Sequence, residues 1–367
     1  MLTSALSNGT TVKKLIVSLT LLLPAPLALA QMQPTPTMVR TLGLVIKFQD
    51  SRSAPMTPDA LGKLLFRGSR SVAAFWRENS YAMTQMVGSV HPAVLTSAYP
   101  TSSGRCYFAM AAEARALAQA QGVDLTKYDT LVVVHSRQPA CGGRGMGGGG
   151  VAVMNGGGQS STYLAHEYGH ALGLGHASSI VCATVLGTNG SCTYNEYGNT
   201  FDIMSGEHHL QSNAAHKWQM GYLKDRVHVH SGGKQTYAIK PLEMADGMVA
   251  VNVPKQIART DPSTGITRAT RVDLWVEYRQ PLSSDNVGTS FLAPFMYGGA
   301  MINYRGSIQV RTRSRECRPC LIHAHNGVGR YNFALKPGET YLDKKTNTAI
   351  TVEAMTPEAM TLTVESL

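Results

Sequence analysis

One run of eleven residues constrains this chain more than any other feature. Residues 166–176 read HEYGHALGLGH. His166 and His170 are four residues apart, and on a helix this spacing places both imidazoles on one face. The segment therefore has to begin as a helix that offers two metal-ligating side chains from neighbouring turns.

The third histidine cannot join the other two on a continuous helix. Six residues beyond His170, the side chain of His176 would lie about 9 Å farther along the axis and on another face. Gly173 allows the chain to turn, because glycine accepts positive φ without a steric penalty. Three neutral imidazoles and a water form the open tetrahedral site of catalytic zinc. The run therefore predicts His166, His170 and His176 as ligands of Zn²⁺.

Glu167 is the predicted catalytic residue. It lies about 100° around the helix from His166, near the open side of the metal rather than among its ligands. A carboxylate there can take a proton from a metal-bound water. The full pattern fixes five positions, and a random chain of this size would match it well under once in about 10⁴ cases. A buried cluster of unpaired histidines would also be a costly core.

These residues carry a family resemblance. The run matches the pattern HExxHxxGxxH in full, so the chain resembles the metzincin zinc peptidases. Residues 201–206 (FDIMSG) are similar to the Met-turn of that group. The resemblance implies that Met204 packs beneath the metal and does not bind it.

A narrower resemblance is to the gametolysin family. Residues 213–222 are similar to the helix that follows the Met-turn there, and residues 275–279 (WVEYR) also resemble that group. Gly206 stands where some metzincins have a tyrosine near the metal, and His166 stands where some gametolysin-like members have glutamine. The residue that stabilises the oxyanion is left open among three candidates: Tyr197, His208 and His209.

The first thirty residues read as a signal peptide. Lys13 and Lys14 precede the apolar run 15–23, and Ala28 and Ala30 provide the small residues before a cleavage site at Gln31. The run is shorter than the ~20 residues of a membrane span, which disfavours the alternative of an anchor. The sequence predicts a secreted protein, extracellular or periplasmic, with no membrane span.

The chain is basic, with 33 Lys and Arg against 23 Asp and Glu, a net charge of +10. Removing the two leader lysines leaves 31 against 23, or +8. Such a charge favours acidic partners, but no nucleic-acid motif is present. Contact with anionic glycan or cell wall is one interpretation of the arginine-rich stretch, and a solvated charged face is the other. Its arginines are Arg305, Arg311, Arg313, Arg315 and Arg318.

Six cysteines, an even number in an exported chain, indicate disulfides. Proximity in sequence favours Cys182–Cys192 and Cys317–Cys320, which leaves Cys106–Cys141, one of 15 pairings. The residues of 317–325, CxxCxxHxH, also suit a second zinc site, but a local disulfide is the favoured interpretation.

The mature length of 337 residues predicts two domains. Residues 31–225 alternate strand and helix, so we expect an α/β (α+β), metzincin-like catalytic domain. Its predicted strands are 42–48 and 131–134, and its predicted helices are 57–68, 71–85 and 107–121. Residues 226–367 carry β-branched and alternating runs, and they predict an all-β, sandwich-like domain.

Residues 142–158 contain ten glycines. No Gly-Lys-Ser/Thr follows them, which excludes a phosphate-binding loop of the P-loop type. We expect a mobile rim around the short strand 151–154, whose edge can pair with an extended peptide.

Together these features predict a secreted zinc endopeptidase acting on polypeptide or glycoprotein substrates. One rival is a zinc hydrolase of non-peptide amides. The other is an adhesive or glycan-binding protein whose metal site is vestigial, and the intact Glu167 argues against it.

Overall fold

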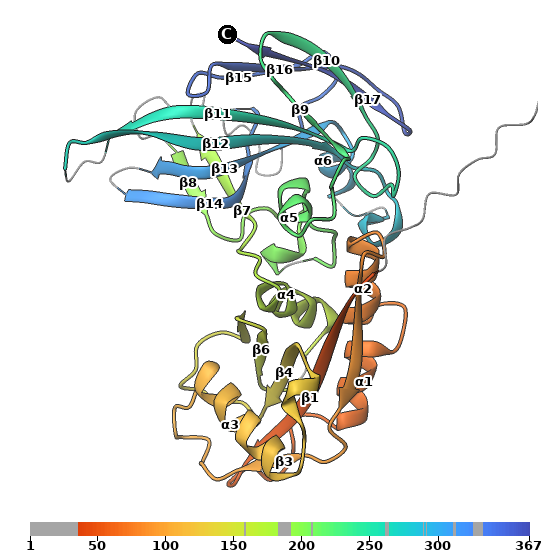
Figure 1. Ribbon diagram of the computed structural model, residues 1–367, viewed down its shortest axis with the longest axis vertical. Coiled ribbons are helices and arrows are strands. Elements are labelled where there is room, and N and C mark those ends of the chain that lie inside the picture. Colours follow the sequence, from red (N-terminus) through yellow and green to blue (C-terminus); the bar gives the residue numbers. More distant parts are fainter. Residues whose placement is uncertain are drawn as a thin grey trace, which may run out of the picture. The chain divides into compact units, whose positions relative to one another are not determined.

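A mixed α/β region is followed by a β-rich region in the computed structural model (Figure 1). The structure describes residues 36–157, 159–182, 192–206, 208–260, 264–288, 290, 292–310, 313–325 and 333–367. The predicted signal peptide, residues 1–30, lies outside the described residues. The prediction of an α/β part followed by antiparallel β structure is confirmed at this level.

The first sheet is mostly parallel. Its order is β2-β1-β4-β6-β5, with β3 also paired to β1, and β5 is the one antiparallel edge. The predicted strands at 42–48 and 131–134 lie within β1 and β4. The strands of this sheet are β1 (Thr37–Phe48), β2 (Thr84–Val90), β3 (Leu95–Ser97), β4 (Thr130–His135), β5 (Gly145–Gly148) and β6 (Val151–Asn155).

Helices cover both faces of this sheet, because its strands are apolar on both sides. In β4, Val132 and Val134 face the core shared with α1, α2 and α4, whereas Leu131 and Val133 face the core shared with α3. Two separate cores therefore fix the sheet between its helices. The helices are α1 (Pro58–Phe66), α2 (Val72–Asn79), α3 (Phe108–Ala120) and α4 (Ser161–Ala171).

The predicted helix 71–85 is too long. Ser71 caps α2 through its side chain, as expected, but the helix ends at Asn79. Tyr81 and Ala82 then adopt positive φ, which no helix tolerates, and Ser80 bonds the carbonyl of Thr84. Residues 84 and 85 belong to β2 instead. The prediction was too long because Met83, which follows the turn, continues the helical spacing of apolar residues.

The β-rich region contains two sheets that share one core. A seven-stranded sheet has the order β8-β7-β14-β13-β12-β11-β9, and a four-stranded sheet has the order β10-β17-β16-β15. Side chains of both sheets, such as Val253 and Val276 from one and Val352 and Leu362 from the other, meet in a single cluster. The strands are β7 (Ser178–Cys182), β8 (Cys192–Asn195), β9 (Val227–Val229), β10 (Lys234–Ile239), β11 (Ala250–Thr260), β12 (Thr267–Tyr278), β13 (Ala300–Val310), β14 (Arg313–Ile322), β15 (Thr340–Asp343), β16 (Thr348–Met355) and β17 (Met360–Ser366).

The seven-stranded sheet crosses the predicted domain boundary at residue 225. Strand β7 precedes the boundary and pairs in parallel with β14, which follows it. Residues Pro36–Leu367 form one compact unit. The short elements between the strands are η1 (Leu125–Lys127), η2 (Ile203–Ser205), α5 (Ala214–Gln219), η3 (Ser283–Asp285) and α6 (Ala293–Met296).

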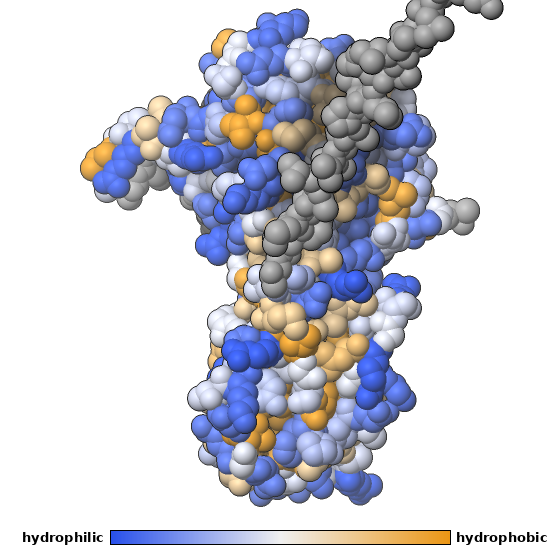
Figure 2. All heavy atoms as spheres, turned by 45° about the vertical axis from the view of Figure 1, so that its right-hand side comes forward, coloured by the Kyte–Doolittle hydropathy of each residue, from blue (hydrophilic) through white to orange (hydrophobic). Residues whose placement is uncertain are grey.

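Hydrophobic residues on the face drawn in Figure 2 lie in several small, separate groups among hydrophilic ones. Single exposed apolar side chains are ordinary in folded proteins. Among the helices of the described residues, none is both long and apolar enough to cross a bilayer.

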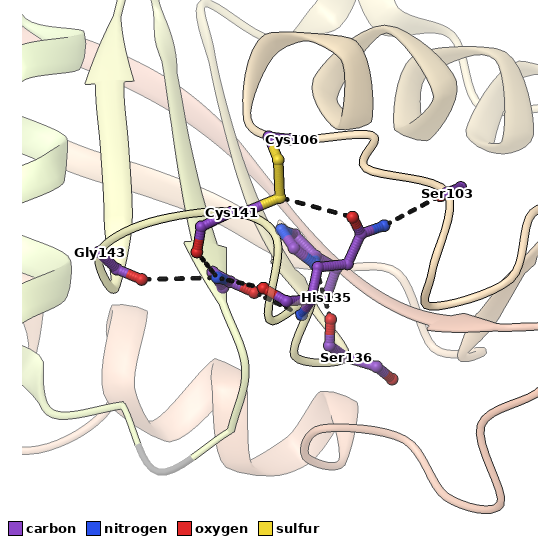
Figure 3. The surroundings of a disulfide bond; sticks show 8 residues. Ser103, Cys106, His135, Ser136, Cys141 and Gly143 are labelled. Atoms are coloured by element: carbon purple, nitrogen blue, oxygen red, sulfur yellow. Dashed lines mark hydrogen bonds between the residues drawn. A yellow bond between two sulfur atoms is a disulfide. The ribbon is translucent and has the colours of Figure 1, made fainter.

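Three disulfides join the six cysteines as Cys106–Cys141, Cys182–Cys192 and Cys317–Cys320. The favoured pairing is therefore confirmed, and the Cys317–Cys320 bond removes both thiolates that a second zinc site would need. Around Cys106–Cys141, the side-chain amide of Asn155 donates to the carbonyls of Cys141 and Gly143 (Figure 3). These bonds fix the loop that leads into β5.

Candidate metal centre

Helix α4 carries the first two histidines, as the spacing predicts. The side chain of Ser160 caps it by accepting a hydrogen bond from the backbone N–H of Tyr163. The helix ends at Ala171, and Gly173 follows with φ of +99°, the left-handed backbone that glycine accepts freely. The chain therefore turns where the sequence predicts, and His176 returns toward the helix.

The three predicted ligands converge. One ring nitrogen from each of His166, His170 and His176 lies within 4.8 Å of the others. The Nε2 atoms of His166 and His170 are 3.1 Å apart. In tetrahedral zinc sites with metal–nitrogen bonds of about 2.0–2.1 Å, ligand atoms are about 3.3 Å apart. This triad can hold a metal ion.

The other ring nitrogen of each histidine faces an acceptor. Nδ1 of His166 lies 2.9 Å from the carbonyl of Ile203, and Nδ1 of His170 lies 2.8 Å from the carbonyl of Leu174. Nδ1 of His176 lies 2.8 Å from Oε1 of Glu196. These acceptors assign the proton to Nδ1 and leave each Nε2 with a free lone pair, the arrangement typical of metal-bound histidine.

Burial keeps two of the imidazoles neutral. It lowers the pKa of His166 to about 4, and it lowers the pKa of His170 to about 4 with a further contribution from the neighbouring His166. Neutral imidazole is the form that binds a metal. Two lone pairs 3.1 Å apart repel each other unless a cation lies between them, so the residues present fit a divalent ion.

Glu167 lies in the predicted position beside the triad. Its side chain is buried, and its Oε2 has no hydrogen-bond partner among the described residues. Burial raises its pKa to about 7. An unpaired buried carboxylate oxygen is costly, and such groups are concentrated at functional sites.

Strand β5 lies directly against this part of α4. A Cβ added to Gly145 would lie 2.9 Å from Cγ of Glu167, and one added to Gly147 would lie 2.1 Å from the carbonyl oxygen of Glu167. Two glycines of the glycine-rich segment are thus required for close approach of strand and helix. The segment contains strand β5 at the edge of the sheet, and the predicted short strand 151–154 is confirmed within β6.

The predicted Met-turn lies under the triad-bearing helix. Met204 is fully buried, and its Sδ would be 2.4 Å from a Cβ added to Gly169. The carboxylate of Asp202 accepts hydrogen bonds from the backbone N–H of Met204 and from Nδ1 of His216. Burial alone would raise the pKa of Asp202, but His216 and the hydrogen bonds lower it overall.

The three oxyanion candidates differ in position. The ring of Tyr197 lies 4.2 Å from that of His176 and 6.4 Å from that of His166. His209 instead packs 4.6 Å from Phe75 and contacts Thr162. Within the described part of the chain, no hydrogen bond, ion pair or ring contact joins His208 to the triad. Tyr197 is therefore the candidate that the structure brings to the centre.

Sequence reasoning missed Glu196 and His216 as parts of this centre. Glu196 lies twenty residues beyond His176, and nothing in the local pattern marks it as its partner. His216 lay in a stretch singled out by resemblance, but its contact with Asp202 depends on tertiary packing.

Comparisons with known proteins add little. No family model and no curated protein matches the chain. Among solved structures, the chain is similar to one described as "Structure of a chaperone-substrate complex", at 16% sequence identity and a TM-score of 0.25. That match covers 38% of this chain and 24% of the other. A likeness this low carries no argument, so the centre has to be interpreted from its own residues.

Proposed function

We propose that this protein is a secreted zinc-dependent endopeptidase of the metzincin type, resembling the gametolysin family, that hydrolyses extracellular proteins or glycoproteins. One observation carries the proposal. One ring nitrogen from each of three imidazoles lies within 4.8 Å of the other two, beside a buried carboxylate oxygen that has no hydrogen-bond partner among the described residues. A metzincin-like catalytic fold and a sandwich-like C-terminal part belong to the same proposal. The three disulfides support export to an oxidising compartment.

Each residue of the site has a separate role in the proposed reaction. His166, His170 and His176 would hold zinc, which supplies Lewis-acid polarisation of the scissile carbonyl and lowers the pKa of its water. Glu167 takes the proton of the attacking water at Oε2 and then delivers it to the leaving nitrogen. Ile203, Leu174 and Glu196 hold the three rings in orientation through Nδ1. The free edge of β5 can pair with an extended peptide.

The proposal is tested by zinc analysis combined with a casein or gelatin digestion assay, with and without a chelator. We expect about one zinc per chain and cleavage that stops on chelation and returns with zinc. Glu167→Ala should retain zinc and lose nearly all turnover, because the proton acceptor is gone. Substantial residual turnover in this variant would contradict the role of Glu167. Metal-independent glycan binding without cleavage would favour the adhesive alternative.

Tyr197 is the residue we propose as hydrogen-bond donor to the carbonyl oxygen in the transition state. Its ring packs on His176, and burial, Glu196 and Glu167 all raise its pKa, so it stays protonated at neutral pH. Tyr197→Phe should lower kcat about 100-fold or more while zinc content is unchanged. Tyr163→Phe, which removes the hydroxyl of a tyrosine on helix α4 and keeps its ring, is the control. Equal kcat in the two variants would exclude Tyr197 from this role.

A further inference from the structure

A cavity of about 410 Å³ opens beside the triad. Part of its lining comes from the histidine-bearing segment, including His170, Gly175 and His176, and another part comes from strand β14. The strand contributes Arg315 and Arg318. Two arginines from the C-terminal region therefore face a space that a substrate side chain can enter when a peptide lies across the histidines.

The two arginines are held in place by groups that are not acids. The guanidinium of Arg315 lies 5.6 Å from the centre of the Tyr194 ring. The aliphatic part of the Arg318 side chain packs against Gly175, since a Cβ added to Gly175 would lie 3.2 Å from Cβ of Arg318. The carbonyl of Arg318 accepts a hydrogen bond from Nε2 of His216. Within the described part of the chain, no carboxylate pairs with either guanidinium.

The acids that line the same cavity have other partners. Oε1 of Glu196 pairs with Nδ1 of His176, and Oε2 of Glu316 accepts from the hydroxyl of Ser307 at 2.8 Å. The hydrogen-bond donors of the arginines are therefore free to meet a ligand. Arginine binds carboxylates through paired N–H groups more strongly than it binds neutral acceptors.

We infer that this cavity is a specificity pocket for an acidic side chain, so that the enzyme cleaves next to Asp or Glu. The inference rests on the proposed peptidase function and names its substrate class. A side chain in this cavity would come from a residue close to the scissile bond, because His170 and His176 form part of its lining. A glutamate there would place its carboxylate against Arg315 and Arg318.

The test uses internally quenched peptides with both ends blocked, which removes terminal carboxylates. Sets are matched so that one position near the scissile bond is Glu, Gln or Lys. For the zinc-loaded full chain, we expect kcat/KM for the best Glu peptide to exceed that for its Gln partner about tenfold or more. Arg315→Gln, Arg318→Gln and the double variant should reduce this ratio toward one.

Arg268→Gln is the matched control, since it removes the same charge from an exposed position outside the cavity. It should keep the wild-type preference. Arg318→Glu provides a second readout, because it should invert the preference toward Lys over Glu. A Glu-to-Gln ratio near one in the wild type, or a ratio that the cavity variants leave unchanged, would overturn the inference while leaving the peptidase proposal intact. Absence of any chelator-sensitive cleavage would instead overturn the peptidase proposal.

Discussion

At the scale of single residues, helix α4 packs closely on Met204 beneath the histidines. Gly169 is the residue of α4 that lies over Met204, and a methyl group there would meet the sulfur at 2.4 Å and Trp76 at 3.1 Å. Because Trp76 and Met204 are both fully buried, neither can move away at low cost. The glycine is therefore a packing requirement within the helix.

Gly169→Ala should lower the free energy of unfolding by about 1–3 kcal/mol through overpacking and weaken zinc binding. Denaturant titration and competition with a chromogenic chelator measure the two effects. Gly62→Ala in α1 is the control, since its added methyl group meets the flexible end of Arg67. The free energy of unfolding of that variant should rise by up to about 1 kcal/mol. If Gly169→Ala were as stable as the wild type, the tight packing described for Met204 would be wrong.

The convergence of the three histidines could be predicted from the sequence because its geometry is local. Helical spacing and one glycine turn bring His166, His170 and His176 together without help from distant residues. The acceptors of their Nδ1 protons could not be predicted, because two are backbone carbonyls and one is Glu196. Every residue has a backbone carbonyl, so the sequence does not indicate which carbonyl accepts a hydrogen bond.

At the scale of elements, β5 and α4 form the wall in which Glu167 lies. Gly147→Ala should push the strand away, because the new methyl group would lie 2.1 Å from a backbone oxygen and 2.7 Å from Cβ of His170. A displacement of about 1 Å can reduce turnover about 100-fold. We expect Gly147→Ala to lower kcat/KM about 100-fold and to retain its zinc.

Gly142→Ala, in the loop before β5, is the control, since no atom lies within 4 Å of its added Cβ. It should cleave peptides at the wild-type rate. Indistinguishable kcat/KM values for Gly142→Ala and Gly147→Ala would show that close contact between β5 and α4 is unimportant for catalysis.

Elements with strong local patterns could be predicted, whereas the pairing of strands distant in the sequence could not. The buried strands at 42–48 and 131–134 follow from continuous apolar runs. Residues 313–322, which form β14, carry arginines and two cysteines in place of an alternating apolar pattern, so the sequence did not predict a strand there. Its pairing with β7, about 140 residues earlier, has no local signal.

At the scale of the whole molecule, buried histidines couple stability to pH. Burial lowers the pKa of His135, and burial together with the charge of Arg70 lowers the pKa of His209 to about 4. The unfolded chain binds protons on these residues below about pH 6.5, whereas the folded chain binds them only at lower pH, at about pH 4 for His209. Their contribution to stability is therefore complete above pH 6.5 and decreases as the pH falls below it, for His209 over the range from 6.5 to 4.

Chemical denaturation of the chelator-treated protein at several pH values measures this dependence. We expect the free energy of unfolding to decline steadily between pH 6.5 and 4, with a smaller slope for His209→Gln. A slope that this variant leaves unaltered would show that His209 titrates alike in the folded and unfolded chains.

The pairing of β7 with β14 has a consequence for any attempt to dissect the chain. A fragment that stopped at residue 225 would keep all three histidines and Glu167, yet β7 would lose the neighbour that satisfies its backbone on one side. Such an open edge recruits other chains. The truncated fragment should therefore aggregate, and it should also lose its substrate selectivity. Strand β14 contributes both the pairing that covers β7 and the arginines of the cavity.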